Sequence, residues 1–189
     1  MTDREGTPVG TLGRVDTTAA DPAGGHPLLA AKLSVPVIRT PVVGRPRLIE
    51  LVSHGVEGPL TVVSGAAGAG KTLLLASWTA EGSAPGPVAW VTLDSFDDQP
   101  GVFWAYVIEA LRRAGVELED VGHPFVAESV ARPLLARVAD SLARRSTPVV
   151  LVLDQLDVLG HRQIREDIDF VLHAAAPMLR LVLLTRNDG

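Results

Sequence analysis

The segment that most constrains this chain is GAAGAGKT, which spans Gly65–Thr72. It fits the pattern G-x-x-x-x-G-K-[ST], with an apolar run at 60–64 before it and a helical pattern at 71–79 after it. In such a unit the glycines let the backbone wrap around phosphate oxygens. The N–H groups of the loop and of the helix N-terminus point inward as donors. The sequence therefore predicts a phosphate-binding loop between a strand and a helix.

The polar residues of the loop have separate predicted roles. Lys71 would reach the β- and γ-phosphates of a nucleotide, and the Thr72 hydroxyl would take one Mg²⁺ position. Only two of the 17 basic residues are lysines, so a lysine at this position is a selective use of a compact ammonium. The predicted nucleotide contacts are Gly65, Ala66, Ala67, Gly68, Ala69, Gly70, Lys71, Thr72 and Leu73.

Strand and helix patterns alternate through most of the chain. Apolar runs predict strands at 60–64, 87–94, 148–154 and 179–185. Helical spacing predicts helices within 42–52 (Leu48, Leu51 and Val52 on one face), at 71–79, and around Phe103–Leu111, Leu134–Leu142 and Ile164–Ala175. The strand at 148–154 is almost continuously apolar, so we expect it to be buried on both faces. This alternation predicts a three-layer αβα sandwich around a mostly parallel sheet.

Composition narrows the classes of protein further. The 189 residues are 47% hydrophobic and 21% charged, which suits one globular domain. Residues 1–31 lack periodicity and predict a flexible leader, which leaves 32–189 as the domain. No apolar run approaches the ~18 residues of a membrane span. A chain without cysteine or secretion signal suits the cytoplasm, and a net charge of −5 argues against nucleic-acid binding by this segment.

Asp154 and Gln155 follow the third predicted strand. A carboxylate at the C-terminal end of a parallel strand can hold Mg²⁺, directly or through water. Gln155 stands where hydrolytic nucleotide-binding proteins usually carry a second acid. An amide can orient water but cannot accept its proton, so the sequence predicts slow turnover. Asp157 could supply a carboxylate from the following turn.

These motifs resemble the nucleotide-binding domain of MalT-like LuxR-family transcriptional regulators, which belong to the STAND group of P-loop ATPases. Two features narrow the resemblance from P-loop proteins in general to this family. One is W-x-x-L-D with the acidic stretch after it in VAWVTLDSFDDQP, and the other is T-R-N-D at the end of LRLVLLTRND. VLVLDQLDVL is similar to the Walker B strand. KLSVPVIRTPVVGRPRLIELV is similar to the segment that leads into the domain, and its VVGRPRL to the element beside the adenine.

The resemblance implies particular ligands and residue roles. The ligands would be ATP or ADP with Mg²⁺, held by Thr72 and Asp154. Arg186 would sense the γ-phosphate, because a guanidinium just past a strand end can pair with a phosphate oxygen. The implied catalytic set is Lys71, Asp154, Gln155 and Arg186, and the implied base contacts are Val43, Gly44 and Arg45.

The resemblance also carries expectations about assembly. Family members continue into a fifth strand, sensor repeats and a DNA-binding helix-turn-helix, so we expect either the front end of a longer regulator or a truncated relative. DNA would then be bound only through that helix-turn-helix. The strand LTVVS would lie at an exposed sheet edge, which favours association. We expect no membrane partner, and ATP-dependent self-association is a further expectation.

Two other classes of function remain open at this point. One is a P-loop phosphotransferase, although only 35 residues follow Asp154 and its arginines are dispersed. The other is a nucleotide-dependent interaction module that does not hydrolyse. Several features favour structural roles. We expect Trp78, Trp90 and Trp104 in the core, and Arg112–Arg113 and Arg144–Arg145 at the C-terminal ends of helices. Asp94, Asp97 and Asp98 form an acidic loop that favours a solvated, capping role over a part in Mg²⁺ or water handling.

Overall fold

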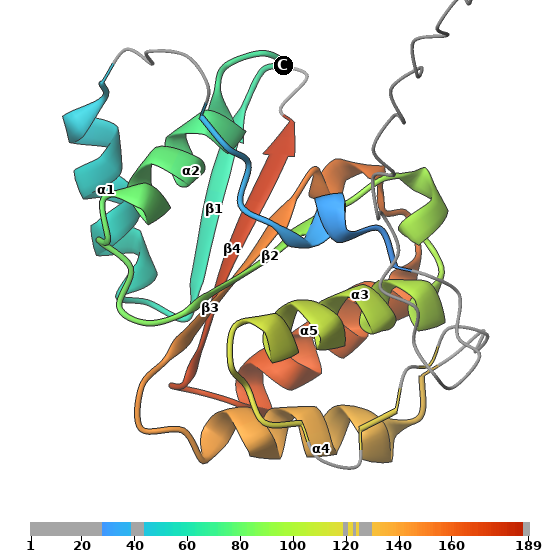
Figure 1. The fold of residues 1–189 in the computed structure, drawn as a ribbon. Helices are drawn as coiled ribbons and strands as arrows, with labels where there is room; N and C mark the ends of the chain where they lie inside the picture. The colour runs from blue at the N-terminus through green and yellow to red at the C-terminus, as the bar shows by residue number, and fades with distance from the viewer. Residues whose placement is uncertain (1–27, 39–43, 119–120, 123, 125–129, 187–189) are drawn as a thin grey trace, which may run out of the picture.

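The computed structural model describes residues 28–38, 44–118, 121–122, 124 and 130–186. They form three layers, with a sheet between α1 and α2 on one face and α3, α4 and α5 on the other (Figure 1). The strands are β1 (Leu60–Gly65), β2 (Val88–Thr92), β3 (Val149–Asp154) and β4 (Leu179–Arg186). The helices are α1 (Pro46–Val56), α2 (Lys71–Ala80), α3 (Pro100–Arg113), α4 (Arg132–Ala143) and α5 (Arg162–Ala174). Three short 3-10 turns are η1 (Ala30–Leu33), η2 (Ser95–Asp97) and η3 (Leu156–Val158). The predicted three-layer α/β fold is confirmed.

The four strands are parallel and lie in the order β1-β4-β3-β2. Their C-terminal ends therefore meet at one edge of the sheet. Gly65 of β1 is in register with Arg186 of β4, and Thr92 of β2 with Asp154 of β3. Ligands of parallel sheets bind at this edge, so the strand order brings the predicted site residues together.

Each face of the sheet has its own apolar core. β3 is buried along its whole length, as its sequence predicts. Leu151 and Leu153 pack into the core beneath α3, α4 and α5, while Val150 and Val152 pack into the core beneath α1 and α2. The predicted burial of the tryptophans is confirmed, because all three are at most 2% exposed: Trp78, Trp90 and Trp104.

The buried face of α1 differs from the predicted one. Ile49, Val52 and Val56 contact the core, whereas Leu48 and Leu51 are 37% and 58% exposed. Two apolar stripes of helical spacing overlap in this segment and share Val52. Periodicity alone does not say which stripe meets the sheet, and the helix runs four residues beyond the predicted end.

Among the strands that the structure describes, β1 occupies one edge of the sheet and pairs only with β4. Its strand prediction is confirmed and so is its edge position, but the prediction of a buried strand is wrong. Leu60 and Val62 are 46% and 55% exposed, because no described helix covers them, whereas Val63 on the other face packs beneath α1 and α2. β1 is thus a half-covered edge strand with one exposed apolar row.

The opposite edge, β2, is covered by the segment 28–38 (Figure 1). Leu33 packs into the core on the α3 side of the sheet, and Val35 packs against the core on the α1 side. The segment therefore passes around the edge of β2. The predicted leader, 1–31, ends inside η1, and residues 1–27 lie outside the described residues.

Candidate nucleotide-binding site

The loop between β1 and α2 has the backbone shape that phosphate binding needs. Gly68 and Gly70 have φ of 74° and 82°, the left-handed region that glycine adopts without steric cost. Gly70 is the residue before α2, and as a glycine it has no side chain with which to cap that helix. The N–H groups of the first turn of α2 therefore face the loop as available donors, at the positive end of the helix dipole.

Lys71 folds its side chain back over the loop. Its ammonium Nζ donates hydrogen bonds to the carbonyl oxygens of Gly65 at 2.6 Å and Ala66 at 3.0 Å. A positive charge consequently lies in the concave side of the loop. Together with the glycine backbone, this charge fits a phosphate group.

Thr72 and Asp154 form an oxygen pair beside Lys71. The Thr72 hydroxyl donates to Asp154 Oδ2 at 2.8 Å, and Asp154 is only 4% exposed at the end of β3. Burial raises the pKa of the Asp154 carboxyl, and this is only partly opposed by the hydrogen bond from Thr72. A buried carboxylate beside a hydroxyl is a donor set that Mg²⁺ prefers, and a cation would offset the cost of that burial. These two residues therefore fit the predicted metal role.

Gln155 has an unusual backbone. Its φ and ψ are 66° and 42°, and it is the one non-glycine residue with positive φ among those the structure describes. Such a conformation costs on the order of 1 kcal/mol for a residue with a Cβ. It turns the chain from β3 into η3, and the Gln155 side chain lines the cavity beside the loop. The sequence pattern shows the absence of a second acid at this position but not this strain.

Arg186 and Asp157 contact each other at the same edge. The backbone N–H of Arg186 donates to Asp157 Oδ1 at 3.1 Å, and the guanidinium Nε lies 3.5 Å from Oδ2. The predicted sensor arginine thus lies beside the phosphate loop, with an acidic partner that the sequence pattern does not reveal. The two residues are 29 positions apart and meet because η3 packs against the end of β4.

These groups surround one cavity of about 370 Å³. It is lined by Ala67, Gly68, Ala69, Gly70, Lys71, Thr72, Leu73, Asp154, Gln155, Asp157, Leu184 and Arg186. The structure thus brings together residues from the loop, β3, η3 and β4. Of the predicted loop residues, Gly65 and Ala66 contribute the carbonyl groups that hold Lys71.

A second cavity of about 290 Å³ adjoins the first on the side of α1 and α2, and both share Gly70 and Leu73. Gly44 and Arg45, predicted beside the base, line it, and Arg45 Nη1 donates to the Ala69 carbonyl at 3.0 Å. Val43 lies outside the described residues. The remaining lining residues, which sequence reasoning missed, are Ile49, Leu74, Ser77 and Glu81.

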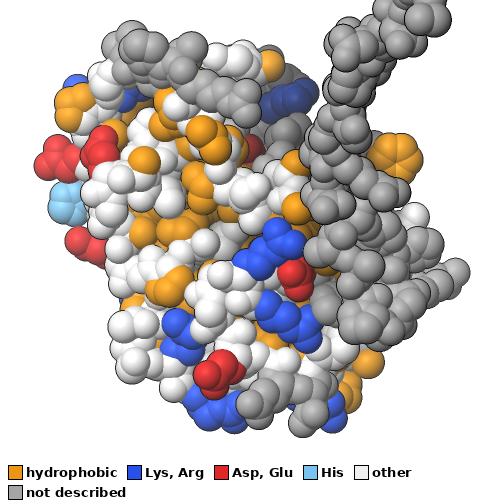
Figure 2. All heavy atoms as spheres, in the orientation of Figure 1, with side chains coloured by type: hydrophobic (Ala, Val, Ile, Leu, Met, Phe, Trp, Pro, Cys, Tyr) orange, Lys and Arg blue, Asp and Glu red, His pale blue; other side chains and the backbone are white. Residues whose placement is uncertain are grey.

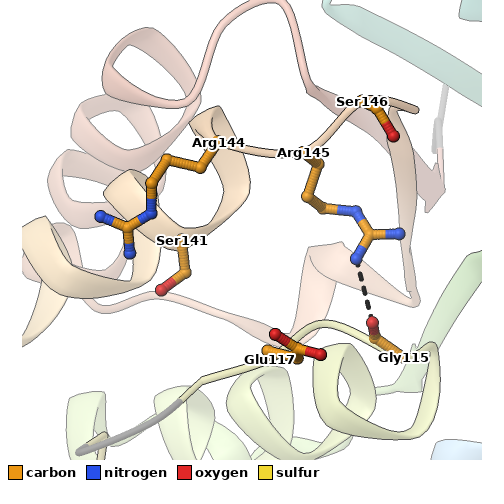
Figure 3. Close-up of a pocket in the computed structure, with 6 residues that line it drawn as sticks. All are labelled: Gly115, Glu117, Ser141, Arg144, Arg145 and Ser146. Carbon is orange, nitrogen blue, oxygen red and sulfur yellow. Dashed lines mark hydrogen bonds between the residues drawn. The ribbon is translucent and has the colours of Figure 1, made fainter.

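A larger cavity, of about 440 Å³, lies away from this edge, between the C-terminal ends of α3 and α4. Figure 3 shows Arg144 and Arg145 on one side of it and Glu117 on the other, with Arg145 directed at the Gly115 carbonyl, 2.9 Å away. The lining charges have mixed sign, and the helix ends present carbonyl groups, so the cavity lacks the donor-rich character of the loop. The predicted helix-end positions are confirmed both for Arg144 and Arg145, which follow α4, and for Arg112 and Arg113 in the last turn of α3.

The acidic loop after β2 has a structural role. Asp94 and Asp97 form a capping box on η2, and Lys32 Nζ lies 2.7 Å from a carboxylate oxygen of each. Asp98 Oδ1 accepts from the His161 backbone N–H at 2.8 Å. The capping prediction is confirmed for Asp94 and Asp97, but the expectation that the loop is solvated is wrong for Asp97, which is buried against Lys32. Sequence reasoning missed the contact with Lys32, although the scarcity of lysine was a signal for it.

Charge on the visible face is mixed. Figure 2 shows Lys and Arg side chains dispersed among acidic and uncharged residues on this face rather than collected in a stripe. A continuous basic surface is the electrostatic feature of nucleic-acid binding, and the described residues on this face do not form one. Within the described part of the chain, none of the helices combines the length and the apolar character needed to cross a bilayer.

Comparison with solved structures gives the same fold. Cdc6p from Pyrobaculum aerophilum is similar with a TM-score of 0.53 and 17% identity over 82% of this chain. The structure of Drosophila ORC bound to DNA is similar with a TM-score of 0.54 and 17% identity over 95% of this chain. The present chain spans 41% and 48% of those two chains, respectively. At this identity the likeness establishes the fold.

The family comparison covers more than half of the chain. A model described as an AAA domain matches residues 56–185, from the end of α1 to the end of β4. The matched range contains the phosphate loop, the Thr72–Asp154 pair and the strand order described above. The chain therefore belongs to the AAA domain family of P-loop nucleotide-binding proteins.

Proposed function

We propose that this domain binds ATP or ADP with Mg²⁺ and acts as a regulatory switch with slow or no hydrolysis. The observation that carries the proposal is the Thr72–Asp154 pair beside the Lys71 loop, followed by a glutamine instead of a second acid. The first feature supplies the ligands of a metal–nucleotide complex. The second leaves the attacking water without a base at the usual position.

Each proposed contact has a physical basis in the site. Lys71 binds the β- and γ-phosphates, and the N–H groups of the loop surround them. Thr72 and Asp154 hold Mg²⁺, which when bound neutralises phosphate charge. Gly44 and Arg45 border the second cavity, whose apolar lining by Ile49, Leu73 and Leu74 suits the base.

Slow hydrolysis follows from the residues around the γ-phosphate position. Gln155 can orient water through its amide but cannot take a proton. The carboxylate of Asp157 is already engaged by both the backbone and the side chain of Arg186. A long-lived bound state is what a switch requires, because its output depends on which nucleotide is bound.

We also propose a MalT-like LuxR-family regulator as the wider context. The resemblance of VAWVTLD and LTRND supports this finer assignment. The mixed charge of the described residues on the face shown in Figure 2 is consistent with DNA binding by a different segment. A regulator of this kind would assemble with ATP and not with ADP. Light scattering of the chain with each nucleotide tests that expectation, and identical masses would contradict it.

The test of nucleotide binding is calorimetric titration with Mg-ATP and with Mg-ADP. Lys71→Ala should abolish binding, while Arg144→Ala at the remote cavity should leave it unchanged. A hydrolysis assay should give well under the roughly 10 turnovers per second of a median enzyme. Absence of binding by the parent chain would overturn the proposal. Rapid phosphate transfer to a small-molecule acceptor would favour a phosphotransferase instead.

A further inference from the structure

Asp157 holds Arg186 through two contacts of different kinds. The hydrogen bond to Oδ1 comes from the backbone N–H, so it keeps Asp157 in place whatever the arginine side chain does. The contact to Oδ2 comes from the guanidinium Nε at 3.5 Å, which is longer than the roughly 2.7–2.9 Å of a strong charge-assisted hydrogen bond. The acid is therefore fixed, and the guanidinium is held more loosely.

Both side chains line the same cavity as Lys71 and Thr72. The Asp157 side chain is 25% exposed and the Arg186 side chain is 48% exposed, so both remain accessible to water. Arg186 is also in register with Gly65, where the phosphate loop begins. A guanidinium at this position has two anionic partners within the site, namely the Asp157 carboxylate and a phosphate bound on the loop.

We propose that Asp157 is a positioning residue that competes with the γ-phosphate for the Arg186 guanidinium and thereby sets the preference for ATP over ADP. This inference rests on the proposed function, because it requires a nucleotide on the loop. Only ATP carries a γ-phosphate, which draws Arg186 away from Asp157. Binding of ATP, but not of ADP, therefore has to break the Asp157–Arg186 ion pair. A ligand shifts such an equilibrium by its differential affinity for the two arrangements.

The competition has a defined direction. Asp157→Asn keeps an oxygen that accepts from the Arg186 backbone N–H but removes the charge that attracts the guanidinium. ATP then no longer has to break an ion pair, while ADP binding changes little. The ratio of ATP to ADP affinity should rise about two- to fivefold, the range expected for a partly exposed pair.

The experiment is a double-mutant cycle on that ratio. Dissociation constants for Mg-ATP and Mg-ADP are measured by calorimetry for the parent chain, Asp157→Asn, Arg186→Ala and the double variant. Asp140→Asn is the matched control, since it removes an acid that pairs with Arg144 on α4, distant from the loop. Circular dichroism melts verify that each variant is folded.

The expected result is a higher ATP preference for Asp157→Asn, an unchanged preference for Asp140→Asn, and a smaller effect of Asp157→Asn when Arg186 is already alanine. If Asp157 acted only by repelling the γ-phosphate, Asp157→Asn would raise the ratio of ATP to ADP affinity equally or more in the Arg186→Ala background. That outcome overturns the proposal. An unchanged ratio in Asp157→Asn does so as well.

Two further results separate this inference from its foundation. No binding of either nucleotide by the parent chain would remove the proposed function and the inference together. Tight, Lys71-dependent binding with an unaltered ratio would remove the inference alone. A loss of turnover in Asp157→Asn that exceeds the change in ATP affinity would identify Asp157 as a proton acceptor and overturn its assignment as a positioning residue.

Discussion

The Thr72 hydroxyl donates a hydrogen bond to Asp154 across 82 residues of sequence, at 2.8 Å. This contact joins the first turn of α2 to the last residue of β3. It exists because β1 and β3 are parallel strands on either side of β4, so the loop after β1 and the end of β3 share one edge. The proposed metal position depends on this strand order.

Asp154→Asn should stabilise the protein in the absence of nucleotide while weakening Mg-ATP binding. Burial raises the pKa of Asp154, so ionisation costs folded-state stability as the pH rises above the ordinary aspartate range. The amide avoids this cost and can still accept from Thr72. Each kcal/mol gained would raise Tm by about 2–4 °C at neutral pH. Calorimetric melts from pH 4 to 8 should show this advantage shrinking as the pH falls; a lower Tm than the parent at pH 7 would contradict the prediction.

Gln155→Glu should raise the hydrolysis rate by at least about tenfold, because it places a carboxylate where general-base catalysis contributes roughly 10²–10⁴-fold in enzymes that have it. Phosphate release under multiple turnover measures the change. Gln155→Gly is the matched control, since it relaxes the positive φ without adding an acid. Equal rates for parent and Gln155→Glu would show that the missing acid is not what limits turnover.

Lys32→Met should destabilise the domain by about 3–5 kcal/mol, the typical cost of leaving a buried charge without its partner. Asp97 is 1% exposed and receives two hydrogen bonds from the Lys32 ammonium, at 2.7 and 2.9 Å. Urea unfolding measures the loss. The double change with Asp97→Asn should recover part of it, because the uncompensated carboxylate is then absent. A neutral effect of Lys32→Met would contradict this account.

The same cluster predicts a pH dependence in the acid range. The hydrogen bond from Lys32 lowers the pKa of Asp94, although burial opposes this. A lowered carboxyl pKa contributes stability above the ordinary value of about 3.9 and loses that contribution as the pH falls through the folded-state value. Unfolding free energies of the parent should therefore fall more steeply below about pH 4 than those of Asp94→Asn. Parallel curves for the two proteins would show that Asp94 contributes nothing to acid sensitivity.

Self-association through the β1 edge is the remaining prediction. No other described strand pairs with its outer side, and its apolar row includes Val62, which is 55% exposed. Val62→Lys should reduce association at high protein concentration, because a charge on an edge strand opposes strand-to-strand pairing. Sedimentation velocity across a concentration series measures this. Leu51→Lys on α1 is the control, since Leu51 is similarly exposed at 58% but distant from strand pairing. A parent chain that stays monomeric throughout would contradict the prediction.

Local patterns predicted the elements well and the contacts between them poorly. The burial of Val149 and the next four residues of β3 follows from their apolar run, and Gly68 and Gly70 adopt the backbone that their motif implies. The exposed Leu51 shows the limit of prediction from periodicity. Helical spacing predicts an apolar face on a helix, but it does not show whether that face packs against the sheet. The hydrogen bond between Lys32 and Asp97 joins residues 65 positions apart, and no local sequence pattern predicts a contact between such distant residues.

The sequence by itself determined the phosphate loop, the alternation of strands and helices, and the glutamine after Asp154, because each depends on residues within one turn or one strand. Only the tertiary structure decided that Asp157 contacts Arg186, that Gln155 carries a left-handed backbone, and that Leu60 and Val62 of β1 are exposed rather than buried. These features depend on the spatial order of the strands in the sheet. That order is set by the packing of apolar faces from the whole chain. Because the hydrophobic effect is non-directional, no single segment predicts it.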